Sequence, residues 1–219
     1  MHLNEDNILG IDLGINNIVT TSDNIGNKPL IIKGGVAKSL NQFYNKQLAK
    51  YKSIAMKCND TELTAYILKL HRKRNNKMRD FLHKTSRKVV NYCIASDIGT
   101  IVLGYNEGWK QGANIGKKNN QNFATIPFRK LVRQIEYKSE MVGIKVVRVS
   151  EEYTSQTCSS CGVARKSNRT YRGFYACKEC GTVLNADVNA SRNILKKGVP
   201  KSTWIGDRGC LNHPLVLKV

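Results

Sequence analysis

Residues 151–195 read EEYTSQTCSSCG, VARKSNRTYRGFYA and CKECGTVLNADVNASRNIL, and this stretch decides how the rest of the chain is organised. Its cysteines have the C-x2-C-x15-C-x2-C spacing of a zinc ribbon, and they are Cys158, Cys161, Cys177 and Cys180. Each pair ends in Cys-Gly, and glycine lets a tight turn around a metal adopt positive φ. Two such turns offer four thiolates for a tetrahedral site suited to Zn²⁺.

Two disulfides or four unrelated thiols are the alternatives for these cysteines, and the matched spacing argues against both. Four thiolates fill the tetrahedron around zinc and leave no open position for water or substrate. The zinc is therefore expected to be structural, and the chemistry is expected to lie elsewhere. The carboxylates that bracket the ribbon are the first candidates, namely Glu151 and Glu152 before it and Asp187 after it.

The composition is strongly basic. The 219 residues contain 36 Lys and Arg against 16 Asp and Glu, a formal net charge of +20. That excess predicts a polyanionic partner, and nucleic acid is favoured over a membrane surface. The sequence has neither an apolar run long enough to span a bilayer nor a basic amphipathic helix with Trp or Phe on its apolar face. Hydrophobic residues make up 41% of the chain, enough for a folded core.

The start of the sequence, MHLNEDN, is polar and acidic, unlike a signal peptide. Together with the zinc-type cysteines, this predicts a reducing, cytoplasmic location in association with the nucleoid. The remaining cysteines, Cys58, Cys93 and Cys210, show no pairing pattern. They are expected to be small buried residues or free thiols.

The N-terminal part predicts three short antiparallel strands over residues 8–14, 18–22 and 29–33, joined by tight turns. Asp12 is the one charged residue within the first apolar run. A position on an edge strand that reaches solvent is one explanation for Asp12. A metal partner is the favoured explanation, because a lone carboxylate in a buried strand needs a partner.

Residues 39–92 follow a basic helical pattern that predicts two helices, and residues 59–62 (NDTE) resemble the N-terminal cap of the second. A solvated helix face and a face that follows phosphates are both consistent with this charge. His71 and His83 are expected at the surface or near phosphate rather than on a metal. The densest positive charge is in residues 69–74, Lys84, Arg87 and Lys88.

Two further strands are predicted at residues 98–104 and 144–149, with a helix from Pro127 to Gly143 between them. Asn185 is expected to cap a last helix over residues 186–196. Residues 198–219 show little pattern. The loop 105–123 is either simply exposed or able to stack on bases and contact phosphates, through Trp109, Lys110, Lys117 and Lys118.

Three stretches, NILGIDLGINN, VSEEYTSQTCSSCG and CKECGTVLNADVNASRNIL, resemble the TnpB family in sequence and in order. This is a transposon-associated, OrfB-type family related to type V CRISPR effectors and to Fanzor proteins. The resemblance extends to about Leu195. It implies an α/β fold, an RNase H-like (RuvC-type) mixed sheet with flanking helices and an inserted zinc ribbon. The domains implied are 1–154 with 184–197 for the RuvC-like domain, 155–183 for the ribbon and 198–219 for a tail.

The resemblance implies RNA-guided, metal-dependent cleavage of DNA, with Mg²⁺ or Mn²⁺ on three carboxylates and Zn²⁺ on the ribbon. Asp12 matches the first acid of the family and Asp187 the third. The second acid departs from the usual pattern, because Gly104 stands where a glutamate ends the corresponding strand. Some TnpB and Fanzor branches carry this acid just before the YTS-x-x-C stretch. Glu151 is the favoured candidate, and Glu152 and Glu107 remain alternatives.

A second departure concerns the N-terminal half that family members use to grip guide RNA and target duplex, because this sequence begins at the first RuvC strand. A fragment, a truncated gene product and a partner of a separate N-terminal chain are all consistent with that. DNA is the expected partner, and guide RNA is expected for the family. The alternative function is a catalytically inactive, nucleic-acid-binding remnant of a TnpB protein.

Overall fold

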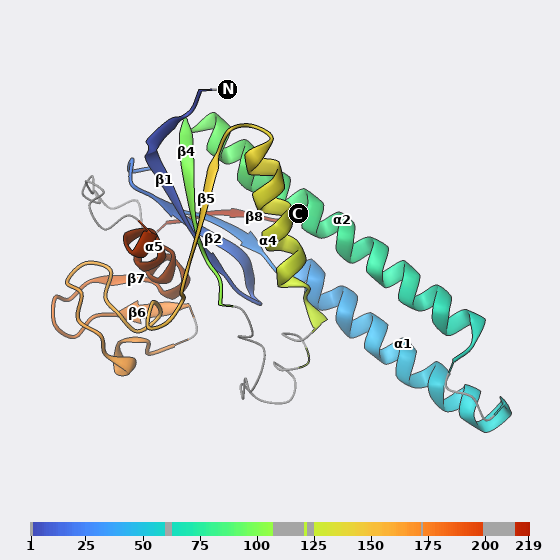
Figure 1. Ribbon diagram of the computed structural model, residues 1–219. Helices are drawn as coiled ribbons and strands as arrows, with labels where there is room; N and C mark the ends of the chain where they lie inside the picture. Colours follow the sequence, from blue (N-terminus) through green and yellow to red (C-terminus); the bar gives the residue numbers. More distant parts are fainter. Residues whose placement is uncertain (1, 60–62, 107–120, 122–124, 172, 199–212) are drawn as a thin grey trace.

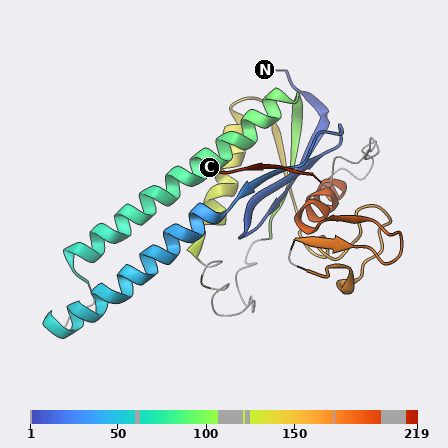
Figure 2. The same cartoon turned by 180° about the vertical axis from the view of Figure 1, so that it is seen from behind.

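The protein is described by a computed structural model, which covers residues 2–59, 63–106, 121, 125–171, 173–198 and 213–219. Its centre is a six-stranded mixed sheet in the order β5-β4-β1-β2-β3-β8 (Figure 1). Helices α2 (Ala65–Ala95) and α4 (Phe128–Glu140) cover one face of this sheet. Helix α5 (Ala186–Gly198) and the cysteine-rich module cover the other face (Figure 2). The result is a mixed α/β architecture with helices on both faces, as the sequence predicts.

The first three strands form the predicted antiparallel meander. Strand β1 spans Asn4–Leu13, β2 spans Asn17–Asp23 and β3 spans Leu30–Lys33. Side chains alternate between the faces of β1, because successive residues of a strand point in opposite directions. The odd positions from Leu9 to Leu13 join the main core under α2 and α4. The even positions face α5, and Asp12 is among them.

Two parallel strands extend the sheet on the other side of β1. Strand β4 spans Ile98–Gly104 as predicted, and β5 spans Lys145–Val149. Val102 pairs with Gly10 of β1, and Gly104 pairs with Val149 of β5. Since parallel strands end at the same edge of a sheet, Gly104 and the residues that follow β5 meet at the edge near Asp12.

Helix α1 (Gly35–Asn59) and α2 form a long hairpin that extends well beyond the sheet (Figures 1 and 2). Tyr44 and His71 join the two helices through a hydrogen bond of 2.7 Å, so His71 serves helix packing. The cap predicted at residues 59–62 is wrong. Thr64 is the N-cap of α2, and its hydroxyl accepts a hydrogen bond of 3.3 Å from the backbone N–H of Ile67.

The end of the chain differs from the sequence prediction. Residues 198–219 show no pattern in the sequence, but Leu215–Leu217 forms β8, which pairs in parallel with β3 and gives the sheet its sixth strand. The prediction for α5 is confirmed at its start. The side chain of Asn185 accepts hydrogen bonds from the backbone N–H groups of Asp187 at 3.0 Å and Val188 at 3.3 Å.

Candidate functional site

The four cysteines of the ribbon come together as their spacing predicts. Among the described residues they are the one group of at least three possible metal ligands whose ligand atoms all lie within 4.8 Å of one another. The Sγ atoms of Cys158 and Cys180 are 3.7 Å apart, and those of Cys161 and Cys177 are 3.6 Å apart. Zn–S bonds of 2.3 Å in a regular tetrahedron require about 3.8 Å between sulfurs. The cluster is therefore compatible with zinc.

The two cysteine turns are built alike. Gly162 and Gly181 have φ of 79° and 71°, the conformation for which the sequence predicts glycine. Each glycine N–H donates to the carbonyl of the first cysteine of its pair, Gly162 to Cys158 at 2.9 Å and Gly181 to Cys177 at 3.0 Å. The strands β6 (Phe174–Ala176) and β7 (Val183–Asn185) pair around the second turn.

Two asparagines on α5 fasten the ribbon to the sheet domain. The side chain of Asn189 accepts from the N–H of Ser159 at 2.9 Å and donates to the carbonyl of Thr157 at 2.8 Å. The side chain of Asn193 donates to Thr157 at 2.7 Å and to Thr154 at 2.8 Å. Sequence reasoning missed this role. Its signal is the spacing of Asn185, Asn189 and Asn193, which puts the three amides on one helix face.

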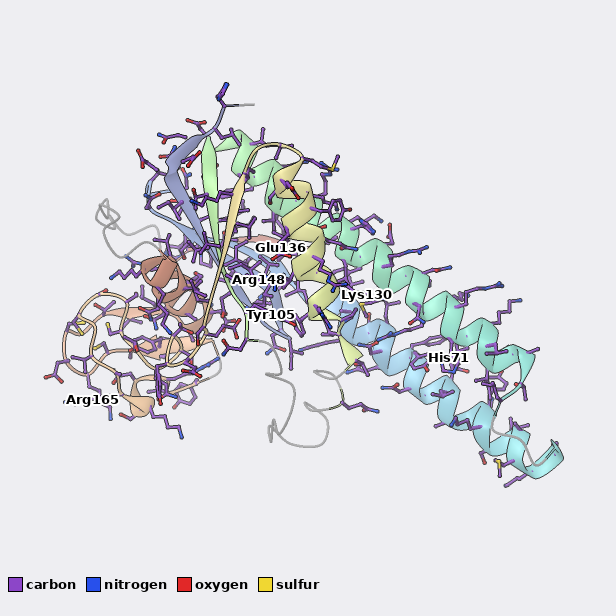
Figure 3. All side chains as sticks on the ribbon, viewed as in Figure 1. His71, Tyr105, Lys130, Glu136, Arg148 and Arg165 are labelled. Carbon is purple, nitrogen blue, oxygen red and sulfur yellow. The ribbon has the colours of Figure 1, made fainter. Side chains whose placement is uncertain are left out.

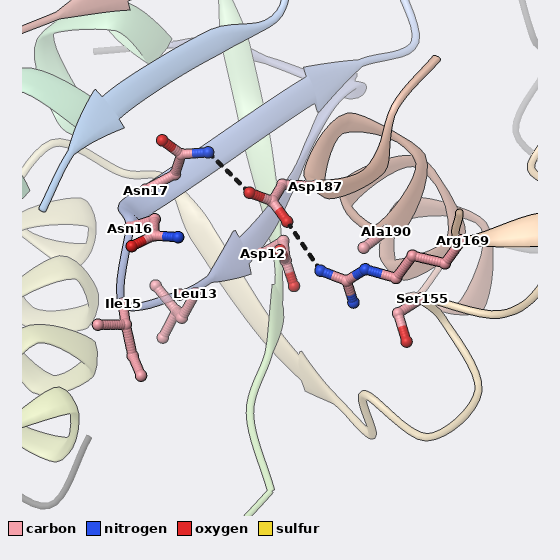
Figure 4. Close-up of a pocket in the computed structure, with 10 residues that line it drawn as sticks. Asp12, Leu13, Ile15, Asn16, Asn17, Ser155, Arg169, Asp187 and Ala190 are labelled. Carbon is pink, nitrogen blue, oxygen red and sulfur yellow. Dashed lines mark hydrogen bonds and ion pairs between the residues drawn. The ribbon is translucent and has the colours of Figure 1, made fainter. Parts of the chain in front are cut away.

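Asp12 and Asp187 line one pocket of about 300 Å³ at the edge of the sheet, together with Asn17 and Arg169 (Figure 4). Asp187 lies in the first turn of α5, where the helix dipole stabilises its negative charge. One of its oxygens accepts a hydrogen bond of 2.7 Å from the side chain of Asn17. The other is 3.6 Å from the guanidinium of Arg169, which comes from the ribbon. Asn17 and Arg169 are site residues that the sequence reasoning did not single out.

Glu151 fills the space beside Gly104. A Cβ added to Gly104 would lie 2.9 Å from the Cγ of Glu151, closer than side-chain carbons pack. A tight turn fixes the backbone of Glu151, since its carbonyl accepts from the N–H of Thr154 at 3.2 Å and from the hydroxyl at 2.8 Å. Tyr153 within this turn has a φ of 60°. The side chain of Glu151 therefore occupies the end of β4, where the family pattern has its own glutamate.

The charges of Glu151 and Asp187 act on the carboxyl group of Asp12. Burial, followed by the charges of Glu151 and Asp187, holds the pKa of Asp12 well above its usual range, and Arg169 opposes this effect. Burial raises the pKa of Glu151 to about 8. One carboxyl oxygen of Glu151 is buried without a hydrogen-bond partner. A buried carboxylate without a partner is costly, and a bound cation is one way to satisfy it.

These features fit divalent cations of the Mg²⁺ type, which bind hard oxygen ligands. The three carboxyl groups do not gather as tightly as the thiols do, because they are absent from the groups within 4.8 Å. A wider spread suits a pair of ions, since two-metal sites hold their ions about 3.5–4 Å apart. Asp12, Glu151 and Asp187 therefore fit a two-ion centre by their chemistry, and their catalytic role remains a prediction.

Glu151 itself is not among the residues that line this pocket, and the remaining sequence candidates do not line it either. Glu152 is exposed and lines a different pocket, beside Thr157 and Lys197. Cys93 is buried and Cys58 is exposed, and neither joins the cysteine cluster. Outside the described residues are Glu107, Trp109, Lys110, Lys117, Lys118 and Cys210.

The α1–α2 hairpin concentrates the positive charge of the chain. Helix α1 has five lysines and no acid, and α2 has nine Lys and Arg and one acid, Asp80. Side chains project along the whole length of both helices (Figure 3). His83 on α2 has a pKa lowered by burial and by Lys138, so it is not held in its charged form there. The hairpin is therefore a cationic surface, and its role toward phosphates remains a prediction.

The strand order, the acids on β1 and at the start of α5, and a ribbon inserted before α5 define a RuvC-like fold with a four-cysteine ribbon module. Comparisons agree with this class. A family model described as a probable transposase (OrfB, IS605 type) matches residues 2–110. A model of the Cas12f1-like TNB domain matches residues 128–194.

Relatives agree with this family, and a solved structure shares the fold. TnpB-like protein ORF457 of Acidianus two-tailed virus is 32% identical over 201 residues, covering 88% of this chain and 42% of that protein. CRISPR-associated endodeoxyribonuclease Cas12f1 of Sulfoacidibacillus thermotolerans is 37% identical over 119 residues, covering 54% of this chain and 27% of that protein. A cryo-EM structure of a Cas12f1–sgRNA–target DNA complex shares the fold, with a TM-score of 0.68 at 23% identity over 88% of this chain and 50% of that chain.

The chain belongs to the TnpB family. The family resemblance and the fold class inferred from the sequence are thereby confirmed. The chain spans less than half the length of the two relatives named above. No helix in the described part of the chain combines the length and the apolar character needed to cross a bilayer.

Proposed function

We propose that this chain is the nuclease part of an RNA-guided DNA endonuclease. Its metal centre, formed by Asp12, Glu151 and Asp187, would hydrolyse phosphodiester bonds of DNA. The observation that carries the proposal is the side chain of Glu151, which lies in the space that Gly104 leaves open. Without that side chain, the glycine at the end of β4 would favour an inactive remnant. With it, three acids from β1, from the segment after β5 and from α5 act on one site.

The acids would hold two divalent cations such as Mg²⁺, which supply Lewis-acid assistance and an activated water when bound. Asn17 restrains one oxygen of Asp187 through its 2.7 Å hydrogen bond and leaves the other directed toward the pocket. Arg169 offers a guanidinium beside these acids, where it can pair with a phosphate oxygen of a bound strand. The roles of these two residues are orientation and charge compensation.

The cysteine cluster, with residues 155–183 as the ribbon, would bind Zn²⁺ for structure only. Four thiolates complete the coordination of a tetrahedral ion. The hydroxyl of Thr182 lies 3.1 Å from the Sγ of Cys180. Hydrogen bonds from this hydroxyl, from the backbone of Thr182 and from the neighbouring thiols lower the pKa of Cys180 to about 6, which favours the thiolate that binds zinc. The ribbon then supports Arg169 at the acidic pocket.

Nucleic acid is the proposed partner, with the α1–α2 hairpin as a phosphate-binding surface. The shared fold supports this, since the Cas12f1 named above was solved in complex with sgRNA and target DNA. RNA guidance is proposed for this chain acting together with further protein segments that recognise guide and target, because the chain spans under half the length of these relatives.

The test is cleavage of labelled single-stranded and double-stranded DNA by the zinc-loaded chain in Mg²⁺ or Mn²⁺, alone and with a guide RNA. Asp12→Ala should abolish cleavage and leave DNA affinity nearly unchanged, because Asp12 holds metal and does not bind the strand. A folded, zinc-loaded protein that cleaves under none of these conditions would support the inactive remnant. Cleavage that persists in Asp12→Ala would contradict the assigned centre.

A further inference from the structure

A second pocket, of about 500 Å³, lies on the other side of the turn that separates β1 from β2. The end of β3, the first turn of α1 and the segment after β8 form its walls. Asn16 lines both this pocket and the acidic pocket, so one turn forms a wall of each. The two pockets therefore share one wall.

Close backbone packing holds this shared wall in place. The N–H of Gly34 donates to the carbonyl of Asn16 at 2.7 Å. A Cβ on Gly34 would lie 2.2 Å from the carbonyl oxygen of Ile15, so only glycine allows β3 to approach the turn this closely. The spacing between the pockets is thus set by backbone contacts rather than by mobile side chains.

The second pocket is cationic. Three lysines line it, Lys33, Lys38 and Lys218, and the described residues of its lining include no Asp or Glu. The ammonium of Lys33 donates to the side-chain oxygen of Asn17 at 3.0 Å, and that of Lys38 donates to the side-chain oxygen of Asn16. An ammonium group has three N–H donors, so Lys33 can bind an anion beyond its asparagine, and Lys38 adds its positive charge to the same pocket.

One hydrogen-bonded chain connects this pocket to the acidic centre. Lys33 donates to Asn17, and Asn17 donates to Asp187 at 2.7 Å. Two side chains, Lys33 and Asn17, therefore connect an anion on Lys33 to Asp187. A nucleic acid strand carries a phosphate at every nucleotide, so a strand with one phosphate at the acids can present a nearby phosphate to the lysines.

We infer that the lysine pocket binds the backbone phosphate of a nucleotide flanking the bond that is cut, in a sequence-independent way. The lysines would hold the phosphate, and the apolar side chain of Val36 would contact the sugar. The inference rests on the proposed function for the identity of the strand. Its chemistry, a phosphodiester in a cationic pocket, does not depend on hydrolysis.

The test measures binding of a short single-stranded DNA to the zinc-loaded full chain in buffer without added Mg²⁺ or Mn²⁺, with one phosphate at a time replaced by a neutral methylphosphonate. The test variant is Lys38→Met with Lys218→Met. The control is Lys28→Met with Lys145→Met, which removes the same charge at exposed positions outside the lining of either pocket. Melting temperature and zinc content establish that both variants fold.

The test variant should lose about fivefold or more in affinity for each lysine and lower the salt slope by about one per lysine. Methylphosphonate at one position should weaken binding to the wild type and to the control but not to the test variant. Equal losses in both variants, or no such coupled position, would overturn the inference. Displacement of DNA by inorganic phosphate at equal charge concentration would overturn it in favour of a free-anion site.

Failure of this inference and failure of the proposed function are distinguishable. One methylphosphonate position that weakens binding of the wild type but not of the test variant, without any metal-dependent cleavage, would support the lysine pocket and refute the nuclease. Cleavage that Asp12→Ala abolishes, with no methylphosphonate position that distinguishes the wild type from the test variant, would support the nuclease and refute the lysine pocket.

Discussion

Gly104→Ala tests the assignment of Glu151 without removing any acid. The new Cβ would meet the Cγ of Glu151 at 2.9 Å and the Cδ1 of Ile194 at 2.5 Å. Carbon atoms pack at about 3.5 Å or more, so Glu151 must move by about 0.6 Å and Ile194 by about 1 Å. A catalytic group misplaced by about 1 Å can cost about a hundredfold in rate. We expect cleavage to fall by about ten- to a hundredfold.

The same substitution overpacks the space between β4 and α5. Overpacking costs about 1–3 kcal/mol, which in a domain of this size lowers the Tm by about 2–12 °C. Ile194→Val removes the Cδ1 atom that makes the shorter contact. The double variant should therefore regain much of the lost Tm, while cleavage stays low because the contact with Glu151 persists.

Single-turnover cleavage in saturating Mg²⁺ separates these effects, with Ile194→Val alone as the matched control. Melting curves on the same preparations report the packing. A Gly104→Ala protein that is folded and cleaves at the wild-type rate would refute the placement of Glu151 at the metal centre. Recovery of cleavage by Ile194→Val would show that the loss came from packing and not from Glu151.

Four further outcomes are expected. Glu151→Gln should reduce cleavage by about a hundredfold or more, whereas Glu152→Gln and Glu107→Gln should change it little, and loss in Glu107→Gln alone would return the second acid to the segment after β4. Cys177→Ser should lose zinc and make the segment 155–184 susceptible to proteolysis, and full zinc content by elemental analysis would contradict the cluster. Mg²⁺ at about ten times its Kd should stabilise the folded chain by about 1.4 kcal/mol, and Asp12→Asn should remove most of the accompanying rise in Tm. Affinity for DNA or RNA should fall steeply between low and physiological salt because hairpin lysines and arginines displace counterions, and a flat salt profile would contradict the phosphate-binding surface.

Local chemistry explains why parts of this molecule are predictable from its sequence. The cysteine turns, their positive-φ glycines and the cap at Asn185 each depend on a few adjacent residues, and the structure confirms these features. Strand β4 is also predicted to the residue, because a continuous apolar run with glycine at its end has few alternatives.

Features that depend on distant partners were not predictable in the same way. Strand β8 has three residues, too few for a period, and its partner β3 is far away in sequence. The start of α2 offered several oxygen side chains, and Thr64 rather than residues 59–62 caps it. Strand alternation predicts that one of Glu151 and Glu152 faces inward, but the turn after β5 decides which one, and Gly104 provides the space.

The asparagines on one face of α5 determine which segment of this protein can be exchanged for that of a relative. Asn189 and Asn193 bind the carbonyls of Thr154 and Thr157, and the same helix begins with Asp187. A chimera that replaces only residues 155–183 would keep α5. It would change the loop whose backbone groups bind the side-chain amides of Asn189 and Asn193. The graft that preserves these contacts runs from Thr154 through Asn193, so transplanting the ribbon from a relative also transplants the third acid.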